Sequence, residues 1–279
     1  MSRLIVNADD FGLTRGVNRA IVELHRSGVL TSTTLMARAE ATAEALKLAA
    51  QNATLGVGCH VVLVDGQPIL PPEKIPTLVD RATGCFPPKL GTFLLRLFSG
   101  RIRAAEIEAE AGAQIAFVQA SGLRLTHIDT HKHTHIFPLV LRPVLRAARA
   151  AGLRAVRNPF EPEWAVHATP RAGLVRRTEV MALRRFGPYF RRLIAQEGFS
   201  TTDGTIAVVG TGTLDADAVR SLMQRLPHGT WELVTHPGYN DADLGRIRTR
   251  LRASRDVERA ALLTLREFPA LDLISFAQM

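Results

Sequence analysis

Short β-branched runs alternate with longer helical patterns along almost the whole chain, and this alternation limits the folds open to it. The first unit is a strand at 4–8 and a helix at 15–27, whose apolar residues recur at helical spacing until Gly28. Alternating strands and helices form a parallel sheet with the helices outside, and seven or eight such units favour a barrel. The sequence therefore predicts an α/β fold, a distorted TIM-barrel-like (β/α) barrel with seven or eight strands.

The remaining elements are predicted from the same two periodicities. Further strands are expected at 31–36, 55–64, 124–129, 154–157, 205–209, 231–235 and 271–276. Further helices are expected at 39–51, 104–121, 138–151, 215–226 and 245–267. Because one barrel accounts for a chain of 279 residues, we expect a single domain over 1–279.

Two segments interrupt the alternation. Residues 65–100 are rich in proline and glycine and too long for a simple connection, which is typical of a lid or substrate loop with short helices. Residues 164–194 mix seven arginines with aromatic and aliphatic side chains. Such a basic amphipathic insertion suits a helix lying on an anionic membrane surface, or an arginine-rich helix packed on the outside of the fold. The composition leaves both interpretations open.

The overall composition, 46% hydrophobic and 22% charged, is that of a soluble globular protein. Two cysteines, Cys59 and Cys85, are too few for a disulfide framework, which favours a reducing compartment. The opening MSRLIVNADDF reads as a strand rather than a signal peptide, and no stretch approaches the roughly 18 apolar residues of a spanning helix. We expect a cytoplasmic protein, free or peripheral on the inner face of the membrane. No nucleic-acid-binding motif accompanies the charge of +9, so no nucleic-acid partner is expected.

Four histidines and an aspartate fall within nine residues, at His127, Asp129, His131, His133 and His135. Imidazole and carboxylate are ligands that divalent ions such as Zn²⁺ or Mg²⁺ accept. If the segment is extended, all five side chains share one face; if it is helical, the histidines form i, i+4 pairs. Either geometry predicts a site for one divalent ion, and these ligand types suit several metals.

Further candidates lie at the ends of other predicted strands. Asp9 and Asp10 end the first strand, His60 lies on the third, Arg157 ends the fifth and His236 ends a late strand. In a parallel barrel the active site gathers at the carboxyl ends of the strands, so all of them fall on one rim. Adjacent carboxylates point to different sides of an extended chain. One aspartate can therefore bind the ion while the other takes a proton.

Four segments together resemble a known family. They are IVNADDFG with TSTT downstream, the GVGCH of the third strand, THIDTHKHTH, and the late THPGY. In order and spacing, over nearly the whole chain, they are similar to the YdjC-like carbohydrate deacetylases. Within that family the chain most resembles the branch associated with hopanoid biosynthesis.

The resemblance implies a barrel related to the polysaccharide deacetylases and a metal-dependent removal of acetyl from an N-acetylated amino sugar. By position, Asp10, His60 and His131 would bind the metal ion. Asp9 would be the general base, and His236, which a Pro-Gly pair follows, would be the general acid.

The other polar residues near these positions are expected to bind the substrate or to support the ligands. Asp129 would orient a ligand histidine, and His133 and His135 belong to the same group. Arg157 would bind the substrate or pair with an aspartate. Many members of the family carry a histidine where this chain has Lys132, whose side chain is expected to face away from the ion.

The predicted function is hydrolysis of the acetyl amide of an N-acetylglucosamine moiety, on a hopanoid glycolipid or, as runner-up, on a chito-oligosaccharide. Amide hydrolysis needs an activated water, a polarised carbonyl and a proton for the amine. An ion held by one carboxylate and two imidazoles keeps positions open for this chemistry. A metal-dependent phosphoesterase is an alternative, because similar clusters build such sites. A non-enzymatic peripheral membrane protein with a structural metal is a further one, although structural zinc sites are usually rich in cysteine.

Overall fold

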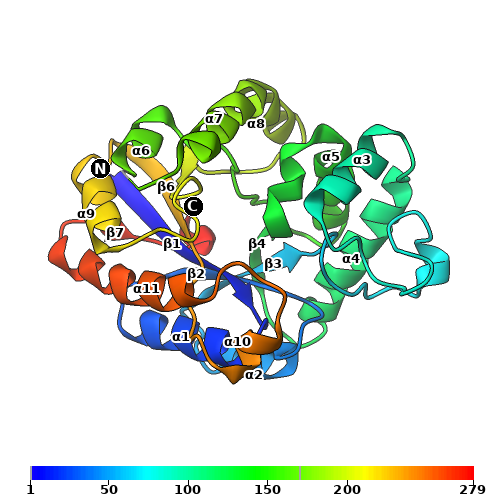
Figure 1. Ribbon diagram of the computed structural model, residues 1–279, viewed down its shortest axis with the longest axis horizontal. Coiled ribbons are helices and arrows are strands. Elements are labelled where there is room, and N and C mark those ends of the chain that lie inside the picture. The colour runs from blue at the N-terminus through cyan, green and yellow to red at the C-terminus, as the bar shows by residue number, and fades with distance from the viewer. Residues whose placement is uncertain (1, 170) are drawn as a thin grey trace.

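The computed structural model describes residues 2–169 and 171–279, and in them one curled parallel sheet has seven strands (Figure 1). The strands are β1 (Ser2–Phe11), β2 (Ser32–Leu35), β3 (Gly56–Val61), β4 (Leu125–Thr130), β5 (Gly204–Ile206), β6 (Gly229–Thr235) and β7 (Asp272–Leu273). Their order is β4-β3-β2-β1-β6-β5, and β7 pairs with the start of β1. The predicted α/β fold with a barrel-like parallel sheet is confirmed.

The helices surround the sheet on its outside (Figure 1). They are α1 (Arg15–Arg26), α2 (Thr42–Ala50), α3 (Leu90–Phe98), α4 (Ala104–Gln119), α5 (Pro138–Ala150), α6 (Glu163–Ala168), α7 (Leu174–Leu183), α8 (Gly187–Gln196), α9 (Ala216–Gln224), α10 (Ala242–Arg246) and α11 (Ala253–Leu262). Short 3-10 helices are η1 (Pro72–Lys74), η2 (His131–Ile136), η3 (Arg184–Phe186), η4 (Leu263–Glu267) and η5 (Phe276–Gln278). Among the helices of residues 2–169 and 171–279, none is both long and apolar enough to cross a membrane.

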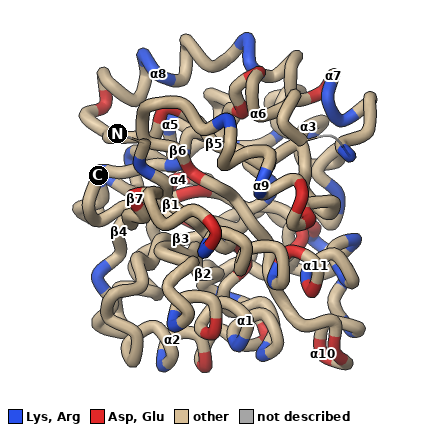
Figure 2. Tube along the Cα trace, turned by 90° about the vertical axis from the view of Figure 1, so that its left-hand side faces the viewer, with Lys and Arg blue, Asp and Glu red and all other residues tan. Residues whose placement is uncertain are grey.

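The carboxyl ends of the strands lie on the side of the molecule opposite the two chain ends. Figure 2 shows the chain ends on one side and α7 and α10 on the other.

The first helix, α1, begins where local sequence signals predict it. Thr14 caps α1 by accepting a hydrogen bond from the N–H of Val17, and α1 buries Val17, Ile21 and Leu24. The carboxyl end of β1 is therefore followed after a short turn by a capped, well-packed helix.

The strand predicted at 154–157 forms only single bridges, one to β4 and one to Ser200. The stretch still links the two edges of the curled sheet. On its far side the N–H of Val156 donates to the carbonyl of Ser200, and the N–H of Thr205 donates to that of Phe160. The prediction of a full strand here is wrong because hydrogen bonding on each side of this stretch is limited to isolated pairs.

The single helix predicted at 245–267 is also wrong, because α10 and α11 are separate. Ile247 has extended backbone angles, which end α10. The Arg252 side chain donates to the carbonyls of Gly245 and Ile247 at 3.1 and 3.3 Å, so the break is stabilised. The break places Arg255 in the first turn of α11, from where it reaches the end of β1.

One face of α4 holds the segment that follows β3. Glu106, Glu110 and Gln114 are spaced four residues apart and are buried. Their side chains bond to the backbone of residues 62–77, with distances of 2.8 to 3.0 Å; the partners are Val62, Ile69, Leu70 and Thr77. These bonds fix the first part of the long segment against the barrel. Its later part forms α3.

Gly58 in β3 leaves room for the His127 ring, which stacks on Phe276 with ring centroids 3.8 Å apart. A Cβ at Gly58 would lie 2.4 Å from that ring. We predict that Gly58→Ala lowers the free energy of unfolding by about 1–3 kcal/mol, because the ring must move within a packed interior. Urea denaturation measures the change. Gly91→Ala, at a position with no neighbour within 4 Å, is the control, and equal midpoints for both variants would contradict the prediction.

Candidate metal centre

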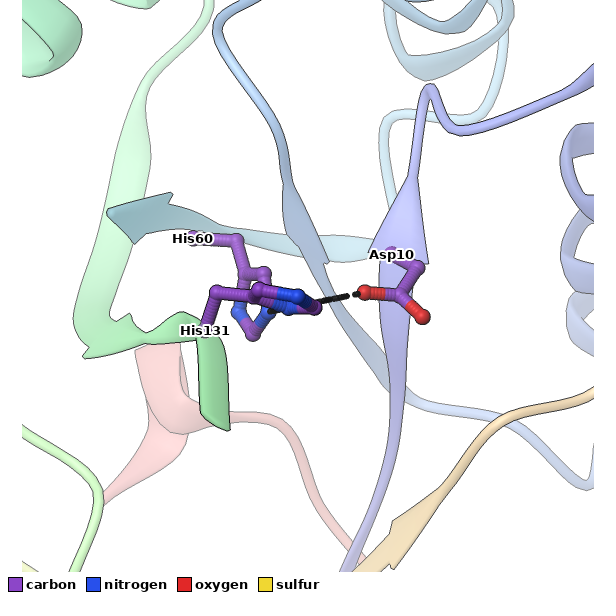
Figure 3. A group of neighbouring side chains, drawn as sticks. All are labelled: Asp10, His60 and His131. Atoms are coloured by element: carbon purple, nitrogen blue, oxygen red, sulfur yellow. Dashed lines mark hydrogen bonds and ion pairs between the residues drawn. The ribbon is translucent and has the colours of Figure 1, made fainter. Parts of the chain in front are cut away.

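The carboxyl ends of β1, β3 and β4 bring Asp10, His60 and His131 together (Figure 3). Asp10 Oδ1 lies 3.6 Å from His60 Nε2 and 3.4 Å from His131 Nδ1, and these two nitrogens are 3.2 Å apart. Two ligand atoms at about 2.1 Å from a tetrahedral ion are about 3.4 Å from each other. The three atoms are therefore spaced as ligands of one divalent ion would be.

The two oxygens of Asp10 have different surroundings. Oδ2 accepts a hydrogen bond from Arg255 Nη2 at 2.5 Å, whereas Oδ1 is buried and has no hydrogen-bond partner among the described residues. Burial acts to raise the pKa of Asp10, but Arg255 and His131 outweigh it and hold that pKa well below its usual value. A buried, ionised oxygen without a partner is costly, and a cation would satisfy it. The donor set thus fits a single metal ion.

Left-handed backbone is concentrated at this site. Five non-glycine residues of the described chain have positive φ, and Asp10, Asp65, Lys132 and His133 are four of them, at 67°, 59°, 56° and 51°. Such conformations cost on the order of 1–3 kcal/mol each and collect at functional sites. Lys132 Nζ donates to Asp65 Oδ2 at 2.8 Å, so its charge is engaged by the segment after β3. This bond ties that segment to the turn that carries His131.

The histidine segment adopts neither of the two predicted geometries. Strand β4 ends before it, and two left-handed residues interrupt η2, so its side chains neither alternate nor follow a helix. His127 lies deeper in the interior, His135 Nδ1 lies 2.7 Å from Thr130 Oγ1, and His133 Nδ1 is buried without a described partner. Burial lowers the pKa of His127 to about 3 and that of His135 to about 4, so both are neutral. Of the four histidines, only His131 reaches the ligand group.

Asp129 lies behind His60 and fixes its ring. Asp129 Oδ1 is 2.7 Å from His60 Nδ1, and the Thr34 hydroxyl is 3.1 Å from the same nitrogen. The other ring nitrogen, Nε2, therefore faces Asp10. Burial lowers the pKa of His60, but Asp129 outweighs burial and raises it to about 9. A carboxylate in this position sets the orientation of a ligand histidine and makes it a stronger donor.

Arg157 is fully buried and holds three carboxylates. Asp9 receives two hydrogen bonds, from Nη1 at 2.9 Å and from Nη2 at 2.7 Å. Glu232 accepts from Nε at 2.8 Å, and Asp129 accepts from Nη1. Burial acts to raise the pKa of Asp9, but Arg157 outweighs it and holds that pKa well below its usual value. Asp9 is therefore ionised, and both of its oxygens are fixed in place.

A second close group consists of Asp9, His60 and Asp129. Arg157 donates to both of these aspartates, so a positive charge already occupies the space between them. A metal cation there would be repelled by the guanidinium. The group that contains Asp10 is therefore the better metal site.

His236 follows β6 and lies beside Asp9. Its Nε2 is 3.9 Å from Asp9 Oδ2, and the side chain is 13% exposed. Its backbone N–H donates to Glu258 Oε2 at 2.6 Å, which fixes the residue from behind. An imidazole ring thus stands next to Asp9 with access to solvent.

Three residues that support the site were missed by sequence reasoning: Thr34, Glu232 and Arg255. Thr34 lies in the TSTT segment, which contributed to the family resemblance but was given no role. Glu232 is the single charged residue of the buried strand β6, a signal that could have marked it. Arg255 is one of many arginines near the carboxyl terminus, and nothing in the pattern distinguishes it.

Comparison with protein-family models matches residues 3–269 to the model described as YdjC-like protein. The chain belongs to this family. It is 32% identical over 262 residues to a carbohydrate deacetylase of Thermoanaerobacter pseudethanolicus, a match that covers 94% of this chain and 91% of the relative. A carbohydrate deacetylase of Halalkalibacterium halodurans is 35% identical over 212 residues, covering 74% and 83%. The family predicted from four sequence segments is confirmed.

Further matches of this YdjC-like protein are to a shorter part of a relative and to solved structures. The match to a carbohydrate deacetylase of Brevibacillus brevis spans about half of each chain, 52% of this one and 55% of the relative. A crystal structure from Enterococcus faecalis, provisionally described as a cellobiose-phosphate cleavage protein, superposes with a TM-score of 0.77 at 26% identity, covering 99% and 98% of the two chains. A lactam utilization protein of Thermus thermophilus, 16% identical with a TM-score of 0.54, covers 98% and 99% and shares the fold.

Proposed function

We propose that this YdjC-like protein is a metal-dependent N-deacetylase acting on an N-acetylglucosamine moiety. The observation that carries the proposal is the group of Asp10, His60 and His131 around an unpartnered carboxylate oxygen, with Asp9 and His236 beside it. An ion bound there would polarise the acetyl carbonyl and make the attacking water more acidic. The carbohydrate deacetylases among the relatives favour this chemistry over phosphate-ester hydrolysis.

In this proposal Asp9 and His236 move the protons. As the water oxygen bonds to the acetyl carbon, Asp9 accepts the water proton. His236 then gives a proton to the amine nitrogen as the carbon–nitrogen bond breaks, leaving acetate and a free amino sugar. Arg157 keeps Asp9 ionised and fixes both of its oxygens, at some cost to its basicity.

The proposed substrate is an N-acetylglucosaminyl hopanoid at the inner face of the membrane. The overall likeness to the hopanoid-associated branch supports it, as does the basic amphipathic insertion at 164–194. In a single domain over 1–279, residues 65–100 would form one wall of the substrate site. A chito-oligosaccharide is the second candidate, because a chitooligosaccharide deacetylase of Proteus mirabilis is 40% identical over 152 residues, 54% of this chain and 56% of that protein.

We predict that the metal-loaded protein releases acetate from an N-acetylglucosaminyl lipid, and more slowly from chitobiose, and that chelation stops both reactions. His131→Ala should lose the ion and the activity together, because it removes one of three ligands. His228→Ala, at an exposed histidine, is the control. Acetate release and metal content are measured side by side. A metal-loaded protein that releases phosphate from an ester, and acetate from neither sugar, would refute the deacetylase.

A further inference from the structure

Two helices near the candidate metal centre expose large apolar side chains. On α3, Leu95 and Phe98 are 71% and 61% exposed, and on α7, Leu174 and Val175 are 77% and 73% exposed. No other large hydrophobic side chain of the described residues is as exposed as these four. A single exposed leucine is ordinary, but the four most exposed large hydrophobic side chains of the described residues fall in two pairs, one on each helix. We refer to Leu95 and Phe98 of α3, and to Leu174 and Val175 of α7, as the two tips.

Both tips lie at the carboxyl edge of the sheet. The ring of Phe98 contacts that of Phe137 at 5.3 Å, and Phe137 directly follows η2, which carries His131. On the other side, Arg176 of α7 donates to the carbonyl of Val208, in the loop that follows β5. Figure 2 shows α3 and α7 on the same side of the molecule, and Figure 1 shows α5 and α8 between them. Both tips therefore lie on the side of the molecule where the strands end and where the candidate metal centre lies.

The positive charge of the chain is concentrated in the segments that carry the tips. Residues 89–103 hold four basic side chains and no acidic one, and residues 164–194 hold seven basic and one acidic. The whole chain has 35 basic and 26 acidic side chains, so the remainder has 24 and 25 and is nearly neutral. These two segments thus account for the net charge of +9.

Several of these arginines are free to meet an external anion. Arg171 and Arg184 pair with acidic side chains of the fold. Arg185, Arg191 and Arg192 are exposed and make no ion pair with an acidic side chain in residues 2–169 and 171–279. They belong to the same segment as the α7 tip. Arg185, in η3 directly after α7, therefore adds unpaired positive charge beside the α7 tip, whereas Figure 2 shows α8, which carries Arg191 and Arg192, on the side of the chain ends.

We propose that the two tips dock the carboxyl side of the sheet, where the candidate metal centre lies, onto an anionic lipid bilayer. Leu95, Phe98, Leu174 and Val175 would enter the boundary between headgroups and acyl chains, while the arginines pair with lipid phosphates. A second copy of the chain is a poor occupant of this face, because it brings like charges together. Nucleic acid matches the charge but leaves the four apolar side chains in water.

Docking in this orientation would bring the metal centre to a lipid-linked sugar. This role of docking rests on the proposed function. The carboxyl edge of the sheet, which carries the candidate metal centre, then faces the headgroup layer, where the sugar of a glycolipid lies. The sugar can reach the metal centre while its lipid stays in the bilayer. A soluble oligosaccharide gains nothing from docking, so the two substrates separate the effect of the tips from that of the active site.

The test uses sedimentation with phosphatidylcholine vesicles, with and without phosphatidylglycerol. The protein should bind the anionic vesicles, less so as salt rises, because the charge is screened. Leu95→Ser with Phe98→Ser, or Leu174→Ser with Val175→Ser, should each lower the partition coefficient by about tenfold. Phe117→Ser, at the end of α4 that leads into the start of β4, is the matched control at an exposed aromatic residue and should bind normally.

Further measurements keep docking and catalysis apart. Acetate release from chitobiose should be unchanged in the double variant of Leu174 and Val175, whereas release from a vesicle-bound N-acetylglucosaminyl lipid should fall with vesicle binding in both double variants. Binding that depends on salt but is indifferent to both double variants would overturn the docking surface. The docking surface would also be overturned if the protein never bound vesicles and the double variants instead dissociated an oligomer. Tip-dependent vesicle binding without acetate release from any sugar would support docking while refuting the deacetylase.

Discussion

Replacing Asp9 with asparagine is expected to lower the turnover of deacetylation by about a hundredfold or more and to leave the metal content unchanged. Asp9 is ionised and its two oxygens are fixed by Arg157, 3.9 Å from His236 at the nearest ring nitrogen. Asparagine keeps the shape but cannot accept the water proton. The proposed ligand Asp10 is untouched. The measurements are the steady-state turnover number for acetate release and the metal content by elemental analysis.

Asp272→Asn makes the same chemical change at an exposed aspartate of β7 and should have normal turnover. Two results would contradict the assignment of Asp9. Near-normal acetate release would remove Asp9 from the proton transfers. Loss of the ion would make Asp9 a ligand, as the second close group with His60 and Asp129 allows.

The fold was predictable because its main signal is local. Strand and helix periodicities are read over a dozen residues, and they located every strand of the described sheet, including β1 and β6. Parallel topology then placed Asp10, His60 and His131 on one edge before any contact was known. The geometry brings these three side chains together from strands far apart in the sequence.

The details that sequence reasoning missed depend on tertiary contacts. Lys132 and His133 adopt left-handed backbone without the glycine that would signal it, and a bond from Lys132 to Asp65 helps to hold this turn. The periodicity over 245–267 continues through the break between α10 and α11, which the Arg252 side chain stabilises through bonds to the carbonyls of Gly245 and Ile247. The basic segment 164–194 is predicted from its composition, but the relation of α7 within it to α3 is not, because only the fold places these two helices on one side.

Replacing Arg157 with methionine is expected to lower the free energy of unfolding by about 3–5 kcal/mol. The change leaves Asp9, Asp129 and Glu232 in a dry interior without the one guanidinium that all three contact. Arg220→Met is the matched control. Arg220 donates to Glu267 at 2.8 Å on the surface, where water screens the pair, so its loss should matter much less. Urea denaturation of both variants gives the comparison.

The pH dependence of this loss identifies its cause. Even with Arg157 present, burial raises the pKa of Glu232 to about 7. A carboxyl that holds its proton more tightly when folded than when unfolded stabilises the protein at low pH and loses that contribution as pH rises. Without the guanidinium, Asp9 and Asp129 also hold their protons more tightly in the folded state. The stability deficit of Arg157→Met should therefore be smallest near about pH 4, the usual carboxyl pKa, and grow towards neutral pH. A deficit independent of pH, or no larger than that of Arg220→Met, would mean that water reaches the three carboxylates and that Arg157 is not what holds Asp9 in place.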